Sequence, residues 1–179
     1  MKDFKKITEN DLEDFAENPN EWLDEKTLTL YYGNSASYDC ELQYSLLDCE
    51  SPIEQMLSLE MAYVGLVNVC MYNPFIDILA IENQKEIKVK NKKYRVDFFI
   101  PVRYKNQEII EFVIECDGHE FHQKTKEQVE RDNKRQRDLQ TAGYQIIRFS
   151  GTEIYHGAYK CANEIKNIIL SKCKYIKDE

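Results

Sequence analysis

Three acidic residues lie where apolar segments could bring them together. Asp97 is inside one apolar segment, and Glu115 and Asp117 follow the segment 109–114, which is apolar apart from Glu111, directly before Gly118. Residues i and i+2 of a strand point to the same face of a sheet, so Glu115 and Asp117 can face Asp97 on a neighbouring strand. Three converging carboxylates repel one another unless a cation separates them. Because Mg²⁺ and Mn²⁺ take oxygen ligands and leave positions open for water and phosphate, this spacing is compatible with a metal site.

The same residues also have a purely structural interpretation. Asp97 would then pair with Arg95 or Lys93, and Asp117 would form only a turn with Gly118. The spacing by itself favours neither interpretation over the other.

The chain predicts an α/β arrangement around these residues. A helix should begin after Ser51 as N-cap, with Pro52 at its first position, and run to about Leu66. A long polar helix over 123–142 should end at Gly143. Strands are predicted over residues 76–81, 86–90, 94–100 (closed by Pro101), 109–114 and 144–149, and Thr152 should cap a last helix. The apolar segment 109–114 is typical of a central strand covered on both faces.

Composition and length place limits on the protein class. With 179 residues, 42% of them hydrophobic, the chain can build the core of one domain. Residues 1–48 are acidic and weakly patterned, so we expect an N-terminal appendage, with a short helix near 11–15 and a strand near 28–32, followed by a main domain over 49–179. Neither a membrane span nor a signal peptide is predicted, which favours a cytoplasmic protein with reduced cysteines.

The charge distribution is uneven along the chain. The net charge is −8, yet residues 1–62 carry 15 acidic and 4 basic side chains, whereas residues 84–106 carry eight basic side chains against two acidic ones. A basic region separated from an acidic one is compatible with phosphate binding. Uneven charge on a solvated surface is the alternative interpretation.

The ordered set of motifs resembles the PD-(D/E)xK nuclease superfamily. Within it, the chain looks most similar to the branch of very-short-patch repair endonucleases and DUF559 proteins. The matching segments are Ser51–Glu54, Tyr94–Phe98, Ile114–His122, Arg131–Asp132, Arg135–Leu139 and Gly143–Phe149. The resemblance covers about residues 50–170 and implies a restriction-endonuclease-like αβββαβ core, with a mixed central sheet flanked by helices.

The resemblance also implies roles for individual residues. Asp97 and Glu115 would be metal ligands for Mg²⁺ or Mn²⁺, and the backbone carbonyl of Cys116 would be a further ligand. Glu54 would take the place of the acidic residue on the first helix. Ser51 and Glu54 also match a capping box, in which Glu54 only satisfies the helix start, and the two roles are compatible.

The chain departs from the superfamily pattern at Asp117, where the third motif usually has a lysine. We expect Asp117 to complete the site, and the missing lysine favours the alternative of an inactive module with the same fold. His122 is the candidate base in this branch because a neutral imidazole accepts a proton near pH 7, with His119 as second choice. Lys124 could supply the missing positive charge. Zinc binding by the two histidines is a minor alternative.

Basic residues follow the candidate site on the predicted helix 123–142. Arg131 and Arg135 are four positions apart and share a face, so either could contact a phosphate, as could Lys124. Arg148 on the next strand could brace a carboxylate. Ion pairing with Asp132 or Asp138 is the structural alternative for these arginines.

The sequence therefore predicts a metal-dependent endonuclease that hydrolyses phosphodiester bonds in nucleic acid, with DNA as the expected partner. One alternative is a catalytically inactive nucleic-acid-binding module of the same fold. Another is a regulatory interaction protein whose acidic residues 1–48 dock a protein partner or imitate DNA.

Overall fold

The structure is a computed structural model, and it describes residues 6–11, 14, 17–18, 46–66, 75–104, 108–118 and 125–174. The elements in chain order are η1 (Glu9–Asp11), α5 (Pro52–Tyr63), β1 (Ile76–Ile78), β2 (Glu82–Val89), β3 (Lys92–Tyr104), β4 (Glu108–Asp117), α7 (Lys126–Thr141), β5 (Gln145–Ser150) and α8 (Gly151–Lys174). The predicted strand near 28–32 lies outside the described residues, as does most of the predicted helix near 11–15.

The five strands form one mixed sheet with β3 at its centre. The strand order is β1-β3-β4-β5, and β2 pairs with the other half of β3. β3 is antiparallel to β1, β2 and β4, whereas β4 and β5 are parallel and are joined by α7 as the crossover helix. This confirms the predicted α/β fold with a mixed central sheet flanked by helices, and it is consistent with a restriction-endonuclease-like architecture.

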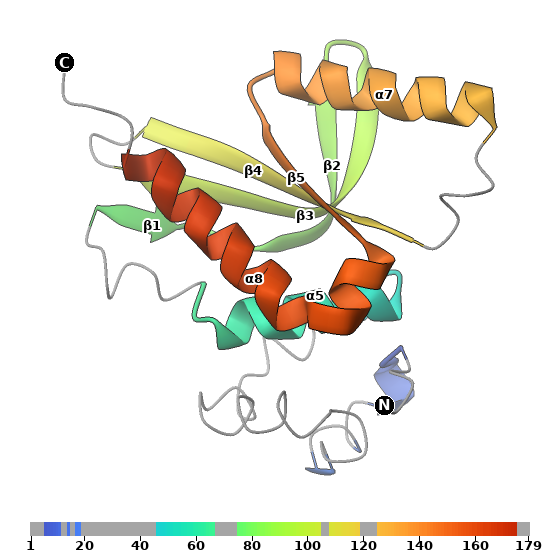
Figure 1. Ribbon diagram of the computed structural model, residues 1–179, viewed down its shortest axis with the longest axis vertical. Coiled ribbons are helices and arrows are strands. Elements are labelled where there is room, and N and C mark those ends of the chain that lie inside the picture. The colour runs from blue at the N-terminus through green and yellow to red at the C-terminus, as the bar shows by residue number, and fades with distance from the viewer. Residues whose placement is uncertain are drawn as a thin grey trace.

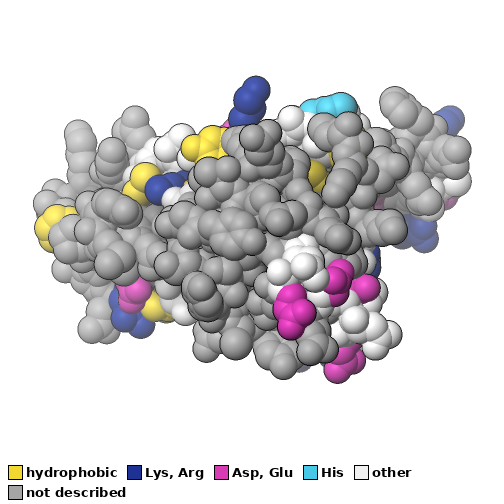
Figure 2. All heavy atoms as spheres, turned by 90° about the horizontal axis from the view of Figure 1, so that it is seen from below, with side chains coloured by type: hydrophobic (Ala, Val, Ile, Leu, Met, Phe, Trp, Pro, Cys, Tyr) yellow, Lys and Arg dark blue, Asp and Glu magenta, His cyan; other side chains and the backbone are white. Residues whose placement is uncertain are grey.

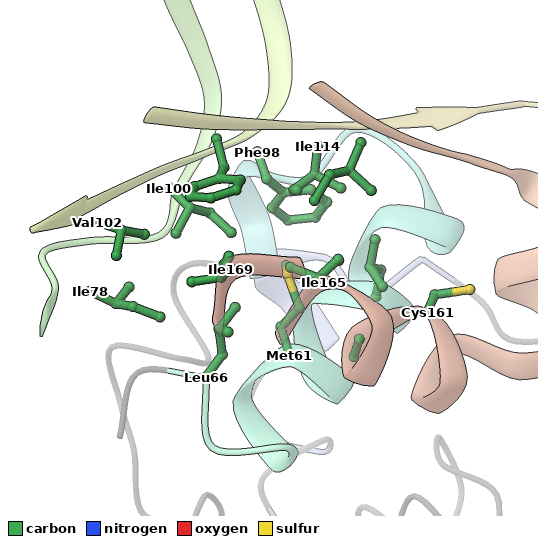
Figure 3. Packing of buried hydrophobic residues seen from close by; sticks show 14 of the residues in the cluster. Met61, Leu66, Ile78, Phe98, Ile100, Val102, Ile114, Cys161, Ile165 and Ile169 are labelled. Atoms are coloured by element: carbon green, nitrogen blue, oxygen red, sulfur yellow. The ribbon is translucent and has the colours of Figure 1, made fainter. Parts of the chain in front are cut away.

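Helices cover both faces of the sheet (Figure 1). α5 and α8 pack together on one face, over a core of residues that includes Met61, Phe98, Ile114 and Ile165 (Figure 3). α7 lies over β2 and the first part of β3 on the other face, where a smaller cluster is made of Ile87, Val89, Val96, Phe99, Val113 and Leu139. β4 contributes to both clusters, which explains why the segment 109–114 is so apolar.

The prediction that Pro101 closes a strand is wrong. β3 continues through Pro101, which pairs with Glu111 of β4, and it ends at Tyr104. The Pro101 carbonyl accepts a hydrogen bond from the Leu79 N–H, so the backbone of Pro101 faces the interval between β1 and β2. The N–H that proline lacks would point into the same interval. The missing donor therefore removes no hydrogen bond of the β3–β4 ladder.

The helix boundaries follow local capping signals. Ser51 caps α5, with Pro52 at its first position, as predicted. α7 ends at Thr141, two residues before Gly143, whose φ of +101° is the left-handed conformation that glycine adopts easily. The prediction that Thr152 caps the last helix is wrong. α8 begins at Gly151, because the Ser150 hydroxyl accepts a hydrogen bond from the Glu153 N–H and the Glu153 carboxylate accepts one from the Ser150 N–H.

The described part of the N-terminal segment packs onto α5. Ile7 and Leu46 are fully buried, and both bond to the side chain of Gln55 on α5. On the face shown in Figure 2, most of the described acidic side chains gather in one group, whereas the described lysines and arginines lie towards the edges of the view.

Two further expectations concern thiols and membranes. Cys49, Cys116, Cys161 and Cys173 are free thiols, and Cys40 and Cys70 lie outside the described residues. Among the described helices, none combines the length and the apolar character that a membrane crossing requires.

Candidate active site

The candidate site lies where β3 and β4 separate. Their antiparallel pairing runs from Tyr104↔Glu108 to Phe98↔Ile114, and the next pair in this register would be Asp97 and Glu115. Beyond it β4 stays paired with β5, as far as Asp117. The β3 strand before Phe98 instead stays with β2 and passes under α7 (Figure 1). We call this point, formed by Asp97 and Phe98 of β3 and Ile114 and Glu115 of β4, the fork.

Asp97 closes the ladder at the fork with its side chain. Its Oδ2 accepts a hydrogen bond of 2.6 Å from the Cys116 backbone N–H. The carboxylate therefore replaces the backbone partner that Cys116 loses when the strands separate. Burial raises the pKa of Asp97, the Cys116 hydrogen bond lowers it, and the charge of Glu54 raises it further. Asp97 is thus a partly buried carboxyl group within electrostatic reach of a second one.

Glu54 reaches the fork from α5 while it also serves the start of that helix. It is buried, and its carboxylate accepts hydrogen bonds from the Ser51 hydroxyl (2.6 Å), the Glu50 N–H (2.8 Å) and the Gln84 side-chain amide (2.7 Å). The Glu54 N–H in turn donates to the Ser51 hydroxyl. The capping role and the approach to the site therefore coexist, with the Glu50 N–H taking the position of the cap N–H in the usual capping box.

Glu115 is held by a bidentate ion pair with Arg135 of α7. Both guanidinium nitrogens Nη1 and Nη2 lie 2.8 Å from the Glu115 carboxylate, which is only 8% exposed. Arg135 Nη2 also donates to the carbonyl of Arg95, two residues before Asp97 on β3. Burial raises the pKa of Glu115 to about 7, whereas Arg135 lowers it and Asp97 raises it. Glu54, Asp97 and Glu115 thus come together from three elements.

Asp117 pairs with an arginine of β5. It forms a bidentate pair with Arg148, with Nε 3.0 Å from Oδ2 and Nη2 2.6 Å from Oδ1. Arg148 Nη1 lies 3.5 Å from the Gln136 side-chain oxygen on α7. Arg148 therefore braces a carboxylate in the way the sequence suggested, and Asp117 is not simply a turn residue.

The other candidate residues are the basic residues and histidines that follow β4 in the chain. Arg131 is exposed on α7, whereas Arg135 is partly buried and bound to Glu115. His119, His122 and Lys124 lie outside the described residues. The structural alternative for Asp97 finds no support, because Arg95 pairs with Glu50 and Lys93 pairs with Glu86.

The donor set suits a hard divalent cation, although the side chains are engaged with protein groups. Within the residues that the structure describes, no three His, Cys, Asp or Glu side chains are arranged to hold a metal ion. Glu115 is turned to Arg135, and Asp97 to the Cys116 N–H. Burial is the main cause of the raised pKa of Asp97 and of Glu115, and the charge of a neighbouring carboxylate raises each further. The three carboxylates offer oxygen ligands, and a cation between them would relieve that mutual repulsion.

Gln84 is a site residue that the sequence analysis missed. It lies on β2 between the pairs Asn83↔Phe98 and Lys85↔Val96, so it is opposite Asp97. The predicted strand 86–90 began after it, and no periodicity or motif distinguishes Gln84. Only the register of β2 against β3 brings it to the fork, and a single sequence does not reveal that register.

Comparison with known proteins gives one match. The family described as REase_MTES_1575, a restriction-endonuclease-like family, matches residues 77–169. This range covers just over half of the chain and contains Asp97, Glu115, Asp117, Arg135 and Arg148, whereas Glu54 precedes it. No curated protein and no solved structure matches significantly.

Proposed function

Because the chain belongs to the restriction-endonuclease-like family REase_MTES_1575, we propose that it is a metal-dependent endonuclease acting on nucleic acid, with DNA as the substrate. The observation that carries this proposal is the convergence of Glu54, Asp97 and Glu115 from α5, β3 and β4 at the fork. Family membership alone supports a nuclease-type function. The motifs quoted from the sequence favour the finer assignment to the branch of very-short-patch repair endonucleases and DUF559 proteins.

In this proposal Asp97 and Glu115 hold Mg²⁺ or Mn²⁺, together with the backbone carbonyl of Cys116. Bound there, the cation would polarise the scissile phosphate and activate a water molecule. Glu54 adds negative charge next to Asp97, as its effect on the pKa of Asp97 indicates. Arg135 must release Glu115 before that carboxylate can coordinate a cation. The freed guanidinium would then be available to a phosphate oxygen, for which its planar donors are well suited.

Asp117 and the residues after it complete the proposed site. Asp117 stands where the superfamily has a lysine, and its pairing with Arg148 places a positive group beside β4 at that position. His122 is the proposed base. Lys124, which precedes α7 in the chain, and the exposed Arg131 on α7 are proposed phosphate contacts.

The decisive measurement is cleavage of plasmid and single-stranded DNA in Mg²⁺, Mn²⁺ or EDTA. We expect the wild type to cut only with metal, and Asp97→Ala and Glu115→Ala to lose roughly 100-fold or more of the rate. Asp77→Ala is the matched control, because Asp77 is an exposed, ion-paired strand residue on β1. Equal cleavage by wild type and both site variants would refute the assignment.

An inactive binding module is the second candidate, and the Arg135–Glu115 pair is the observation that favours it. A guanidinium that permanently occupies Glu115 would exclude a cation from that carboxylate. This candidate predicts DNA binding that weakens steeply with salt, without cleavage in any metal. Titration of the protein against DNA at several salt concentrations, beside the cleavage assay, separates the two candidates.

A further inference from the structure

Gln84 has a backbone conformation that its position in β2 does not explain. Its φ is +51°, and among the described residues other than glycine only Lys90 (φ +56°) shares a positive φ. Lys90 lies in the tight turn between β2 and β3, where a left-handed conformation is usual. Gln84 lies inside a strand, between paired residues on both sides. A left-handed glutamine there is strained, so surrounding contacts must hold it.

The side chain of Gln84 supplies those contacts. Its Nε2 donates a 2.7 Å hydrogen bond to Oε2 of Glu54. The residue also opposes Asp97 across the β2–β3 pairing, and hydrogen bonding from its side chain lowers the pKa of the Asp97 carboxyl group. A carboxamide nitrogen carries two N–H donors, so one neutral group can serve two carboxylates at once.

The neutrality of this group matters for the site. An arginine or lysine in its place would hold the two carboxylates but would also cancel their charge. An amide holds them without adding charge, so their attraction for a cation is kept. Groups that hydrogen-bond to metal ligands, and so orient them, usually contribute strongly to metal affinity.

We propose that Gln84 is a positioning residue of the candidate site, whose side-chain amide fixes the carboxylates of Glu54 and Asp97 in one arrangement at the expense of a strained strand backbone. The inference rests on the proposed function insofar as the arrangement serves a cation. The hydrogen-bonding part of it holds without any metal.

The first test needs no metal. Gln84→Met preserves length and removes the amide, and we expect it to lower the Tm in EDTA by about 2–4 °C. In a Glu54→Ala background the same substitution should lower the Tm by less than half as much, because one of its two partners is already gone. Equal losses in the two backgrounds would show that Gln84 and Glu54 are not coupled, and would overturn the inference.

The second test measures Mn²⁺ affinity from the electron paramagnetic resonance signal of the free ion. We expect Gln84→Met to weaken binding roughly 10-fold, and Gln145→Met on β5 to leave it unchanged. Unchanged affinity in Gln84→Met would overturn the inference while the proposed function stands. If the wild type neither binds Mn²⁺ nor cuts DNA, the proposed function fails, and the Tm comparison in EDTA still decides whether Gln84 positions Glu54.

Discussion

Glu115 shows how burial and an ion pair act against each other on one carboxyl group. The fork buries it beside Asp97, which favours the neutral form, whereas the bidentate contact with Arg135 favours the charged form. Burial dominates, and the pKa is raised to about 7. A group with this pKa changes protonation near neutral pH, so the ionic state of the candidate site depends on pH in the physiological range.

Glu115→Gln should remove a pH dependence of stability. Because the folded-state pKa lies above the ordinary value near 4.5, the stabilisation from neutral Glu115 is complete below about pH 4.5 and is lost as the pH rises through about 7. In EDTA we expect the unfolding free energy of the wild type to fall relative to Glu115→Gln between pH 5 and 8, by at most about 3 kcal/mol. Urea unfolding at several pH values measures this difference.

Glu86→Gln serves as the control for this series. Glu86 is an exposed partner of Lys93, whose hydrogen bond and charge lower the Glu86 pKa, so its pH dependence lies below pH 5. The unfolding free energy of Glu86→Gln should therefore change with pH in the same way as that of the wild type between pH 5 and 8. If the unfolding free energy of Glu115→Gln also changed with pH as that of the wild type does, Glu115 would be ionised throughout this range in the folded protein, and the prediction would be wrong.

At the scale of elements, α7 is fixed over the sheet by few apolar contacts. Leu139 is its one fully buried residue in the structure as described, and Tyr94 of β3 donates a hydrogen bond to Asp138. Arg135 adds its pair with Glu115 and its bond to the Arg95 carbonyl. Since α7 also carries Arg131, a proposed phosphate contact, Arg135 connects the docking of this helix to the ionic state of the candidate site.

Arg135→Ala should destabilise the fold, whereas Arg131→Ala should affect only DNA binding. At pH 8 in EDTA we expect Arg135→Ala to cost about 3 kcal/mol of unfolding free energy, because a buried carboxylate is left without its partner. Arg131→Ala, one turn earlier and exposed, should stay within about 0.5 kcal/mol of the wild type while weakening DNA binding. Urea unfolding and a DNA titration test both statements. Equal stability losses in the two variants would contradict this picture.

At the scale of the whole molecule, the N-terminal segment is joined to the main domain by a buried amide. Gln55 is fully buried, accepts a hydrogen bond from the Ile7 N–H (2.6 Å), and donates to the carbonyls of Ile7 (2.8 Å) and Leu46 (2.9 Å). The acidic segment therefore contributes at least these two residues to the packing around α5. The boundary at residue 48 stays a prediction.

Gln55→Ala should loosen that attachment. Three buried backbone groups would lose their partner, and we expect a cost of about 3 kcal/mol in unfolding free energy. Limited proteolysis should then cut the N-terminal segment earlier than in the wild type. Gln140→Ala on the exposed face of α7 is the control. Wild-type stability and wild-type protease resistance in Gln55→Ala would mean that the segment is held by other contacts.

The sequence by itself determined the features that depend on neighbours along the chain. Hydrophobic periodicity and capping residues located α5, α7 and the strands, because helix starts and strand faces are set within a few residues. The motifs around Asp97 and Glu115 indicated the family that the comparison supports at the coarser level. Pro101 and Thr152 misled the prediction, because a local signal was overruled by the sheet register in one case and by a stronger adjacent cap in the other.

The tertiary structure alone decided several contacts between residues that are distant in the sequence. The pairing of Glu115 with Arg135, the placement of Gln84 opposite Asp97, and the burial of Ile7 against Gln55 all join residues at least 13 positions apart. Such contacts depend on strand register, helix docking and side-chain rotamers, which act over distances that local patterns do not encode. The acidic residues of the candidate site could therefore be identified from the sequence. Their ion-pair and hydrogen-bond partners, and their ionisation states, could be determined only from the folded structure.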